Sequence, residues 1–248
     1  MDLPMSSPSL SFRPQLWSSL LMLALVALFV SLGQWQWGKA ERKAAAQALL
    51  DARAVESPLS LPTTQIGDPA LFHYRRVAAR GQYREAGQIL LDNQMLEGQG
   101  NRVGYRVLTP FVVEGSVIEV LVDRGWIAAP ADRSQLPQIG AVPPAPTYIV
   151  GTAVIPSTKH FALAADSAPP GANARWQFLD LGRYSRESRV DLQPVLVRLD
   201  PDQPAGFLRS WPRPDDRQER HRSYALQWFG FAASAIGIWA WAAVRRAP

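Results

Sequence analysis

The stretch HRSYALQW, residues 221–228, runs directly into an apolar segment that continues to Val244. Residues 224–244 carry no formal charge, and these roughly 21 residues would span about 31 Å as an α-helix, the thickness of a bilayer's hydrocarbon core. The sequence therefore predicts a membrane helix here, with His221 just before its first turn. At about 100° per residue, one side of that helix would carry the following stripe: His221, Tyr224, Trp228, Ala232, Ala235 and Trp239.

A second apolar stretch lies near the N-terminus, where no charged residue occurs between Arg13 and Lys39. It could be a signal peptide, because residues 31–33 are small enough to precede a cleavage site. The run is longer than a usual signal core, and it continues past two tryptophans, residues typical of membrane interfaces, into a helix-forming segment. We therefore expect an uncleaved membrane helix over residues 16–37 and an amphipathic helical extension over residues 38–57.

The segment between these stretches, residues 58–218, has mixed composition and is long enough to bury a core. Short apolar runs alternate there with turn-forming residues, as at 114–116, and no long helical pattern separates them. The predicted fold is mainly β, an antiparallel sandwich or barrel-like domain with short helices, inserted between two transmembrane α-helices, residues 16–37 and 219–246. Residues 1–15 are predicted to be a short tail.

Composition excludes several classes of function. The net charge is +5 and the pI about 9.9, but the basic residues are scattered among acidic ones, so we expect no nucleic-acid binding. The densest basic run, residues 213–222, adjoins the second apolar segment, where cations suit lipid headgroups. The chain has no cysteine, which excludes disulfides, iron–sulfur clusters and thiol-bound copper or zinc. Charge counting leaves the membrane orientation open.

Catalytic motifs are lacking as well. The sequence contains no HExxH, no GxSxG and no phosphate-binding loop, so we expect that the protein is not an enzyme. His73 opens a predicted strand and is expected at a surface or edge, while His160 precedes Phe161 in a loop. Neither histidine has the spacing of a catalytic or metal-binding group.

His221 is the strongest candidate for a ligand site. A neutral imidazole is a common axial ligand of haem iron, and neighbouring aromatic and arginine side chains suit a porphyrin face and its propionates. Alternatively, His221 caps the helix or lies at the interface while the aromatic residues form a belt at the membrane surface. The residues alone leave both interpretations open.

Four stretches together carry a resemblance to the surfeit-locus (Shy) family of cytochrome oxidase assembly factors. LGQWQ at 32–36, followed by Lys39 and Lys43, is similar to the family's L-G-x-W-Q-x-x-R-x-x-x-K, with lysine in place of the usual arginine. The strand from Tyr74 to Gly81 is similar to Y-x-x-V-x-x-x-G. VDRGWI at 122–127 resembles V-N-R-G-W-[IV], with Asp123 where the family often has asparagine, and residues 221–229 resemble H-x-x-Y-A-x-x-W-[FY].

This resemblance implies a two-pass protein of the cell inner membrane, with both termini cytoplasmic and a periplasmic β-rich domain. The implied role is assembly of cytochrome c oxidase, respiratory complex IV, by supplying or stabilising haem a for subunit I. The implied partners are oxidase subunit I, haem a synthase and the lipid bilayer. The implied haem ligand is His221, with Tyr224 and Trp228 against the ring and Arg222 or Arg124 neutralising propionates. The alternative is a membrane-anchored scaffold or sensing module without haem.

Overall fold

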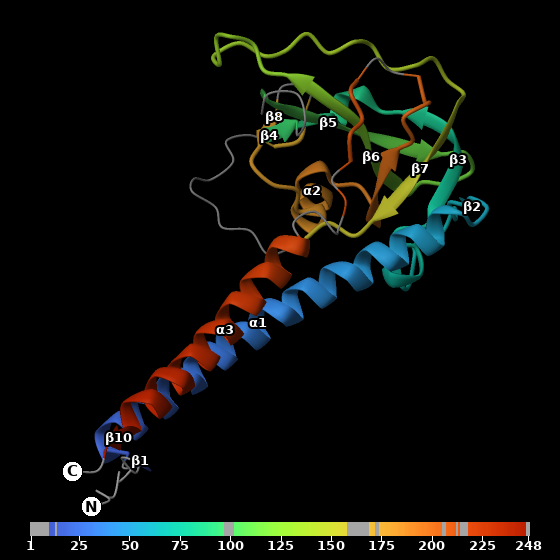
Figure 1. Cartoon of the computed structure of the whole chain (residues 1–248). Helices are drawn as coiled ribbons and strands as arrows, with labels where there is room; N and C mark the ends of the chain where they lie inside the picture. The colour runs from blue at the N-terminus through green and yellow to red at the C-terminus, as the bar shows by residue number, and fades with distance from the viewer. Residues whose placement is uncertain are drawn as a thin grey trace, which may run out of the picture. The chain divides into compact units, whose positions relative to one another are not determined.

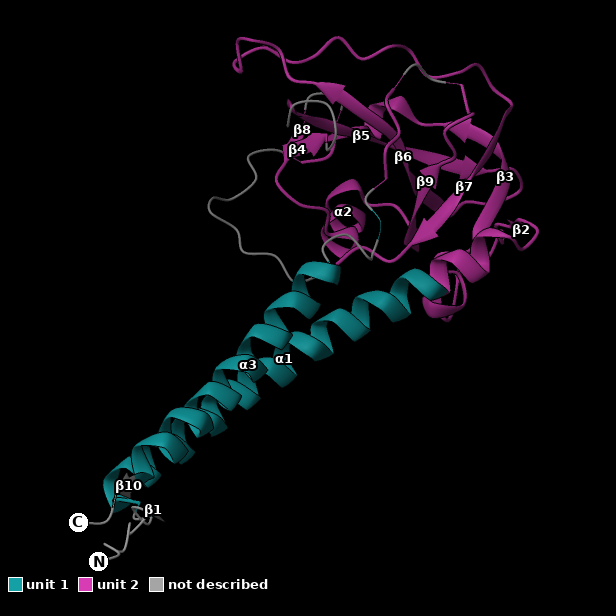
Figure 2. Ribbon diagram, in the orientation of Figure 1, with its two compact units in different colours: residues 1–48, 213–248 teal, residues 49–212 magenta. Residues whose placement is uncertain are grey.

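The computed structural model describes residues 10–12, 14–96, 102–157, 169–171, 174–204, 207–211, 213 and 218–246. It contains two units, shown in different colours in Figure 2. The first combines Met1–Ala48 with Arg213–Pro248, and the second is Leu49–Pro212.

Two helices make up most of the first unit: α1 (Leu16–Ala54), whose last residues belong to the second unit, and α3 (Gln218–Ala243). They lie side by side in the first unit (Figure 1). Trp239, near the end of α3, donates a hydrogen bond of 3.0 Å to Ser19, near the start of α1, so the helices run antiparallel. The short strands β1 (Leu10–Phe12) and β10 (Val244–Arg246) pair antiparallel beside these helix ends.

Helix α1 is continuous through the boundary that the sequence places between residues 37 and 38. Among the described helices, α1 is the one long and apolar enough to cross a membrane by length and composition. Helix α3 has 26 residues, but its glutamines, serines and tryptophans lower its hydropathy. The predicted second transmembrane helix is therefore not shown by these criteria.

Small residues bring α1 and α3 together with a seven-residue spacing. The buried residues of α1 are Gly33, Ala40 and Gln47, and two of those of α3 are Ala225 and Ala232. Such a repeat is typical of two helices that pack along a continuous seam. Small side chains at this seam allow the backbones to approach closely, as in helix pairs within membranes.

The second unit is built around one sheet whose central strands close into a ring (Figure 1). Its strands in chain order are β2 (Leu59–Ser60), β3 (Arg76–Tyr83), β4 (Ile89–Leu96), β5 (Arg102–Val113), β6 (Glu119–Ala128), β7 (Thr147–Val154), β8 (Ala174–Trp176) and β9 (Leu192–Leu199). Their order in the sheet is β2-β3-β7-β9-β6-β5-β4-β8, and β3 also pairs with β5. The ring β3-β7-β9-β6-β5 thus closes, and the predicted barrel-like β domain is confirmed.

The strand pairing is mixed, so the prediction of an antiparallel sheet is wrong in part. Strands β6 and β9 pair in parallel, as do β2 with β3 and β4 with β8. The chain between β6 and β9 contains β7, β8 and the helix α2 (Leu181–Ser188). This connection brings the chain back to the end at which β6 begins, so that β9 runs in the same direction as β6. A parallel pair requires a crossover of this kind.

Side chains on opposite faces of the strands fill two apolar clusters. On β6, Val120 and Val122 enter the cluster inside the closed ring. Leu121 enters a second cluster, which contains Trp176 of β8 and Tyr184 of α2. This is the period-two alternation of an extended strand buried on both faces. The Tyr184 hydroxyl donates to the carbonyl of Gly87 at 2.7 Å, so the helix is also fixed by a polar contact.

Gly125 lies within β6. Its φ of +126° is a backbone conformation that side-chain-bearing residues rarely adopt. The pairing of β5 with β6 shifts register here, which indicates a β-bulge. Next to it, the backbone N–H of Trp126 donates to the carbonyl of Leu208 at 2.7 Å. The glycine therefore re-aims β6 so that a later segment can pair with it.

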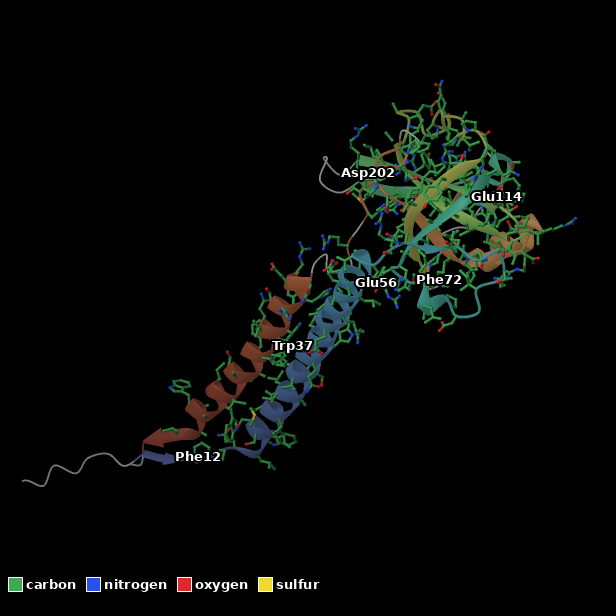
Figure 3. The ribbon with its side chains drawn as sticks, turned by 90° about the vertical axis from the view of Figure 1, so that its right-hand side faces the viewer. Phe12, Trp37, Glu56, Phe72, Glu114 and Asp202 are labelled. Carbon is green, nitrogen blue, oxygen red and sulfur yellow. The ribbon has the colours of Figure 1, made fainter. Side chains whose placement is uncertain are left out.

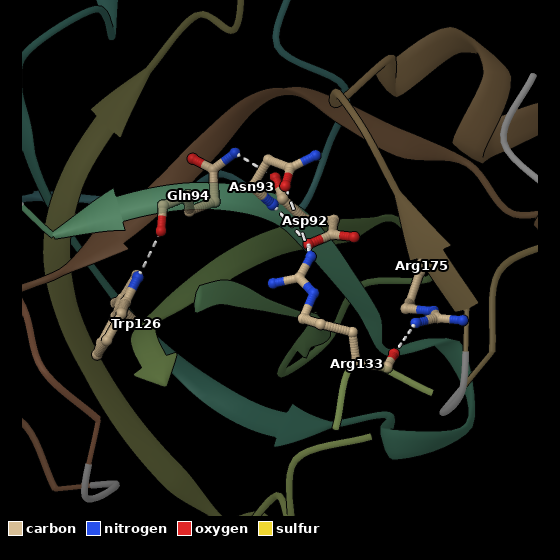
Figure 4. A network of polar contacts seen from close by, with 6 residues as sticks. All are labelled: Asp92, Asn93, Gln94, Trp126, Arg133 and Arg175. Carbon is tan, nitrogen blue, oxygen red and sulfur yellow. Dashed lines mark hydrogen bonds and ion pairs between the residues drawn. The ribbon is translucent and has the colours of Figure 1, made fainter. Parts of the chain in front are cut away.

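A network of polar contacts connects the C-terminal half of β4 with the end of β6 and the loop that follows it (Figure 4). The Trp126 indole N–H donates to the carbonyl of Gln94 at 2.8 Å. Arg133 forms an ion pair of 2.5 Å with Asp92, and Arg175 donates to the Arg133 carbonyl at 2.9 Å. These contacts are local to the β domain, so Trp126 of the VDRGWI motif is a structural residue.

Candidate functional site

His221 lies in the first turn of α3, which begins at Gln218, and its side chain is half-buried. Its Nδ1 lies 2.8 Å from Oε1 of Gln36 on α1. When Nδ1 carries the proton, it donates to this amide oxygen, and the lone pair is on Nε2. Metal-ligating histidines usually have such an arrangement, because the outer hydrogen bond fixes the tautomer and the ring orientation.

A cationic cavity of about 440 Å³ adjoins His221. Its other lining residues all come from α1: Lys39, Arg42, Lys43 and Ala46. Their spacing of three and four residues places them on one face of the helix. The volume is within the range of small-molecule sites, roughly 300–1,000 Å³. Three positively charged side chains beside one imidazole make this cavity suitable for a ligand that carries carboxylates.

An aromatic cluster lies about two turns farther along α3. The ring of Trp228 stacks on Phe29 of α1 with centroids 5.8 Å apart, and it meets Phe231 edge-on at 5.7 Å. Phe29 and Phe231 are themselves 5.8 Å apart. Trp228 thus faces α1, on the same side of α3 as His221.

The seam between α3 and α1 does not include every residue of the stripe predicted for α3. Ala225 is completely buried in the seam, whereas Tyr224 is 45% exposed. The seam follows the seven-residue repeat, and on α3 this repeat includes Ala225 and Ala232. Tyr224, one residue before Ala225, lies outside the repeat. Arg222 is exposed and lies 5.9 Å from the ring of Trp37, the α1 residue labelled in Figure 3. Tyr224 and Arg222 therefore flank the seam.

Arg124 is not at a surface. It is fully buried in β6 and donates to Gln88 at 3.2 Å and to the Ala141 carbonyl at 3.3 Å, with the ring of Phe207 at 4.8 Å. Burial lowers the pKa of Arg124. The guanidinium is part of the interior of the β domain and has no exposed surface at which it could meet haem propionates.

His73 lies in the turn before β3, where its Nδ1 accepts the backbone N–H of Ile155 at 3.0 Å and its ring lies 3.8 Å from that of Tyr74. His160 lies outside the described residues. Within the part of the chain that the structure describes, no cluster of three or more His, Asp or Glu residues could hold a metal ion.

Sequence reasoning missed Gln36 and Arg42 as site residues. Gln36 lies three residues after Gly33 and four before Ala40, so a projection along α1 would have placed it on the side of these buried residues. Arg42 lies on the opposite side of the helix from Gly33, and its part in the site follows only from the cavity that it lines. Lys39 and Lys43 were noted only as parts of a motif. The structure adds that they line the same cavity as His221.

Comparisons with known proteins cover both helices and the β domain. The family model described as the SURF1 family matches residues 23–233. An uncharacterized SURF1-like protein of Mycobacterium bovis is 32% identical, over 91% of this chain and 84% of the relative. A SURF1-like protein of Rickettsia felis is 26% identical over 90% and 95%, and Surfeit locus protein 1 of Mus musculus is 25% identical over 92% and 76%. The chain belongs to the SURF1 family.

Proposed function

We propose that this protein is an assembly factor for haem-copper (cytochrome c) oxidase, which holds haem a and supplies it to, or stabilises it for, subunit I. Membership of the SURF1 family supports the role in oxidase assembly. The observation that carries the haem proposal is the pairing of His221 with Gln36 beside a cationic cavity. A single oriented imidazole is what an axial haem ligand requires.

The charges around His221 fit a haem. Lys39, Arg42 and Lys43 would neutralise the two propionates, and an arginine can bind a carboxylate through two parallel hydrogen bonds. Arg222 is exposed next to this group and could add to it. Tyr224 and Trp228 remain the aromatic residues proposed to contact the ring, Trp228 from within the seam and Tyr224 from its edge.

We also propose that α1 and α3 cross the membrane as a pair, with both termini cytoplasmic and the β domain periplasmic. Helix α3 exposes large apolar side chains that would be unfavourable in water: Leu226 is 63% exposed, Ile238 67% and Trp241 81%. The apolar half of α1, against which α3 packs, is long enough to span a bilayer. This placement would put His221 at the outer membrane face.

Delivery needs no covalent chemistry from this chain. His221 would release the iron when a histidine of subunit I replaces it, and the cationic residues would release the propionates. Haem a synthase is the proposed source of the cargo. The role of the helix pair is to hold the imidazole in one orientation and to shield one face of the porphyrin from water.

The test is the haem content of full-length protein purified in detergent from a host that makes haem a. We expect a Soret band in the wild type and its loss in His221→Ala, with His73→Gln as the matched control that keeps the band. Membranes from a host that carries only His221→Ala should also show an oxidase with reduced haem a absorbance. Full haem content in His221→Ala would contradict the assignment of the ligand.

The alternative function is a membrane-anchored scaffold or sensing module without haem. It would be supported if wild-type protein from such a host showed no Soret band and bound no added haem, while deletion of the gene still reduced the assembled oxidase.

A further inference from the structure

A second cavity, of about 370 Å³, lies between α1 and α3 on the other side of the aromatic cluster from His221. It is lined by Met22, Leu25 and Phe29 of α1 and by Phe231, Ala235 and Ile238 of α3, among others. Its polar lining atoms come from few residues, notably Ser18, Ser234 and the Trp239 indole. We call this cavity the apolar groove.

We infer that the apolar groove holds the isoprenoid tail of haem a. This inference rests on the proposed haem-binding function and assigns a place to a part of the ligand that His221 and the cations leave unaccounted for. Haem a carries its two carboxylates on one edge of the macrocycle and a hydroxyethylfarnesyl chain near the opposite edge. A site for this molecule therefore needs a cationic region and a long apolar groove, with the iron ligand between them.

The helix pair presents these three features in that order. Along α1, the cationic residues begin at Lys39, Gln36 holds the imidazole, and the apolar groove begins at Phe29. Along α3, Phe231 is ten residues after His221, about 15 Å at the rise of a helix, and the apolar groove continues for about another 16 Å to Ala242. The direction of the apolar groove therefore matches the direction in which the tail would leave the ring.

Trp228 lies at the junction of the two sites. It contacts both Phe29 and Phe231, which are the groove residues nearest to His221. A ring that packs against Trp228 would therefore have its tail-bearing edge at the opening of the apolar groove. In this arrangement the two cavities would serve one elongated ligand along the helix pair.

The occupant we assign is the tail of the bound haem and not a phospholipid chain. A free lipid chain gains little on leaving the bilayer for this groove, because both surroundings are apolar. The farnesyl chain of a haem already held at His221 has a high effective concentration at the apolar groove, so its contacts there add to the affinity of the whole molecule. The apolar groove would thus select porphyrins that carry the tail.

The test compares haem o with haem b, which differ in the hydroxyethylfarnesyl group and share the remaining ring substituents. Each is titrated into full-length protein in detergent, and binding is followed by the Soret band. We expect haem o to bind the wild type about tenfold more tightly than haem b, equivalent to about 1.4 kcal/mol. Because haem o also partitions into micelles, the deciding quantity is the ratio of the two affinities across variants.

Ser234→Phe places a ring in the apolar groove, and Ala233→Phe, at the exposed neighbouring position outside the lining, makes a comparable change elsewhere. We expect Ser234→Phe to reduce the haem o affinity to that of haem b, with haem b binding unchanged as proof that the fold is intact. Ala233→Phe should keep the wild-type ratio. Equal ratios in Ser234→Phe and Ala233→Phe, with both haems still dependent on His221, would overturn the tail site alone. Binding of neither haem would overturn the proposed haem function and this inference together.

Discussion

A Cβ atom on Gly33 of α1 would lie 2.4 Å from Cε1 of Phe229 on α3, well inside van der Waals contact. We therefore expect Gly33→Ala to force the helices apart and to destabilise the helix pair by about 1–3 kcal/mol. Thermal unfolding in detergent, followed by tryptophan fluorescence, measures this. Gly230→Ala is the control, because a Cβ at Gly230 meets no atom within 4 Å. Equal melting temperatures for the two variants would contradict the close packing.

Asp123 provides a test of the interior of the β domain. Its carboxylate accepts hydrogen bonds from Arg106 at 3.1 Å and from the backbone N–H of Gly125 at 3.2 Å, and burial raises the pKa of Asp123 although Arg106 and Arg198 oppose this. Asp123→Asn keeps an acceptor and should change the free energy of unfolding by less than about 1 kcal/mol. Asp123→Leu leaves the arginine buried without its partner and should cost about 3–5 kcal/mol.

Circular dichroism of the full chain during thermal unfolding distinguishes the two Asp123 variants. The resemblance to a family in which this position is often asparagine agrees with the expected tolerance. If Asp123→Asn unfolded at the same temperature as Asp123→Leu, the charge of the carboxylate and not its acceptor geometry would be the stabilising feature.

The barrel-like domain could be predicted because its strands are short, apolar and separated by turns. The strand partners could not be predicted in the same way, because they depend on contacts far apart in the chain. Strand β9 pairs in parallel with β6 although β7, β8 and α2 lie between them in sequence. Local patterns identify a strand, but its neighbour is chosen by which apolar faces meet in the closed ring.

The surroundings of the candidate site also depend on contacts between segments far apart in the chain, which local sequence patterns do not show. The chemistry of an imidazole predicts a ligand site at His221, and an ideal helical projection predicts Tyr224 on the same side of the helix, whereas in the structure Tyr224 is 45% exposed. The packing of the two helices decides which residues are buried, and along α3 these include Ala225 and not Tyr224. Arg124 was chosen for its charge, and its complete burial is a property of the domain interior that sequence alone does not reveal.

His73 should make the stability of the β domain depend on pH. Burial lowers the pKa of His73 below 6.5, and the nearby charges of Arg53 and Arg198 lower it further. The folded state therefore binds a proton less readily than the unfolded state. The stabilising contribution is complete above the unfolded pKa of 6.5 and is lost as the pH falls through the folded pKa.

Urea unfolding of wild type and His73→Gln at pH 7.5 and pH 5.5 tests this dependence. Glutamine keeps an acceptor for the Ile155 N–H but does not titrate. We expect wild type to lose more stability than His73→Gln between the two pH values. The same loss in both proteins would show that another group is responsible.

Gln36 should act as a positioning residue for His221. Without its amide oxygen, 2.8 Å from Nδ1, the imidazole loses the hydrogen bond that fixes its tautomer and its orientation. We expect Gln36→Leu to weaken haem binding by about 10–100-fold, the usual effect of losing such an outer hydrogen bond, and to shift the iron–histidine vibration in resonance Raman spectra. Gln36→Glu, which keeps an acceptor, should restore most of the affinity, whereas the same leucine change at the exposed Gln34 should have no effect. A Gln36→Leu protein with wild-type affinity and an unshifted vibration would show that the ring is held by other contacts.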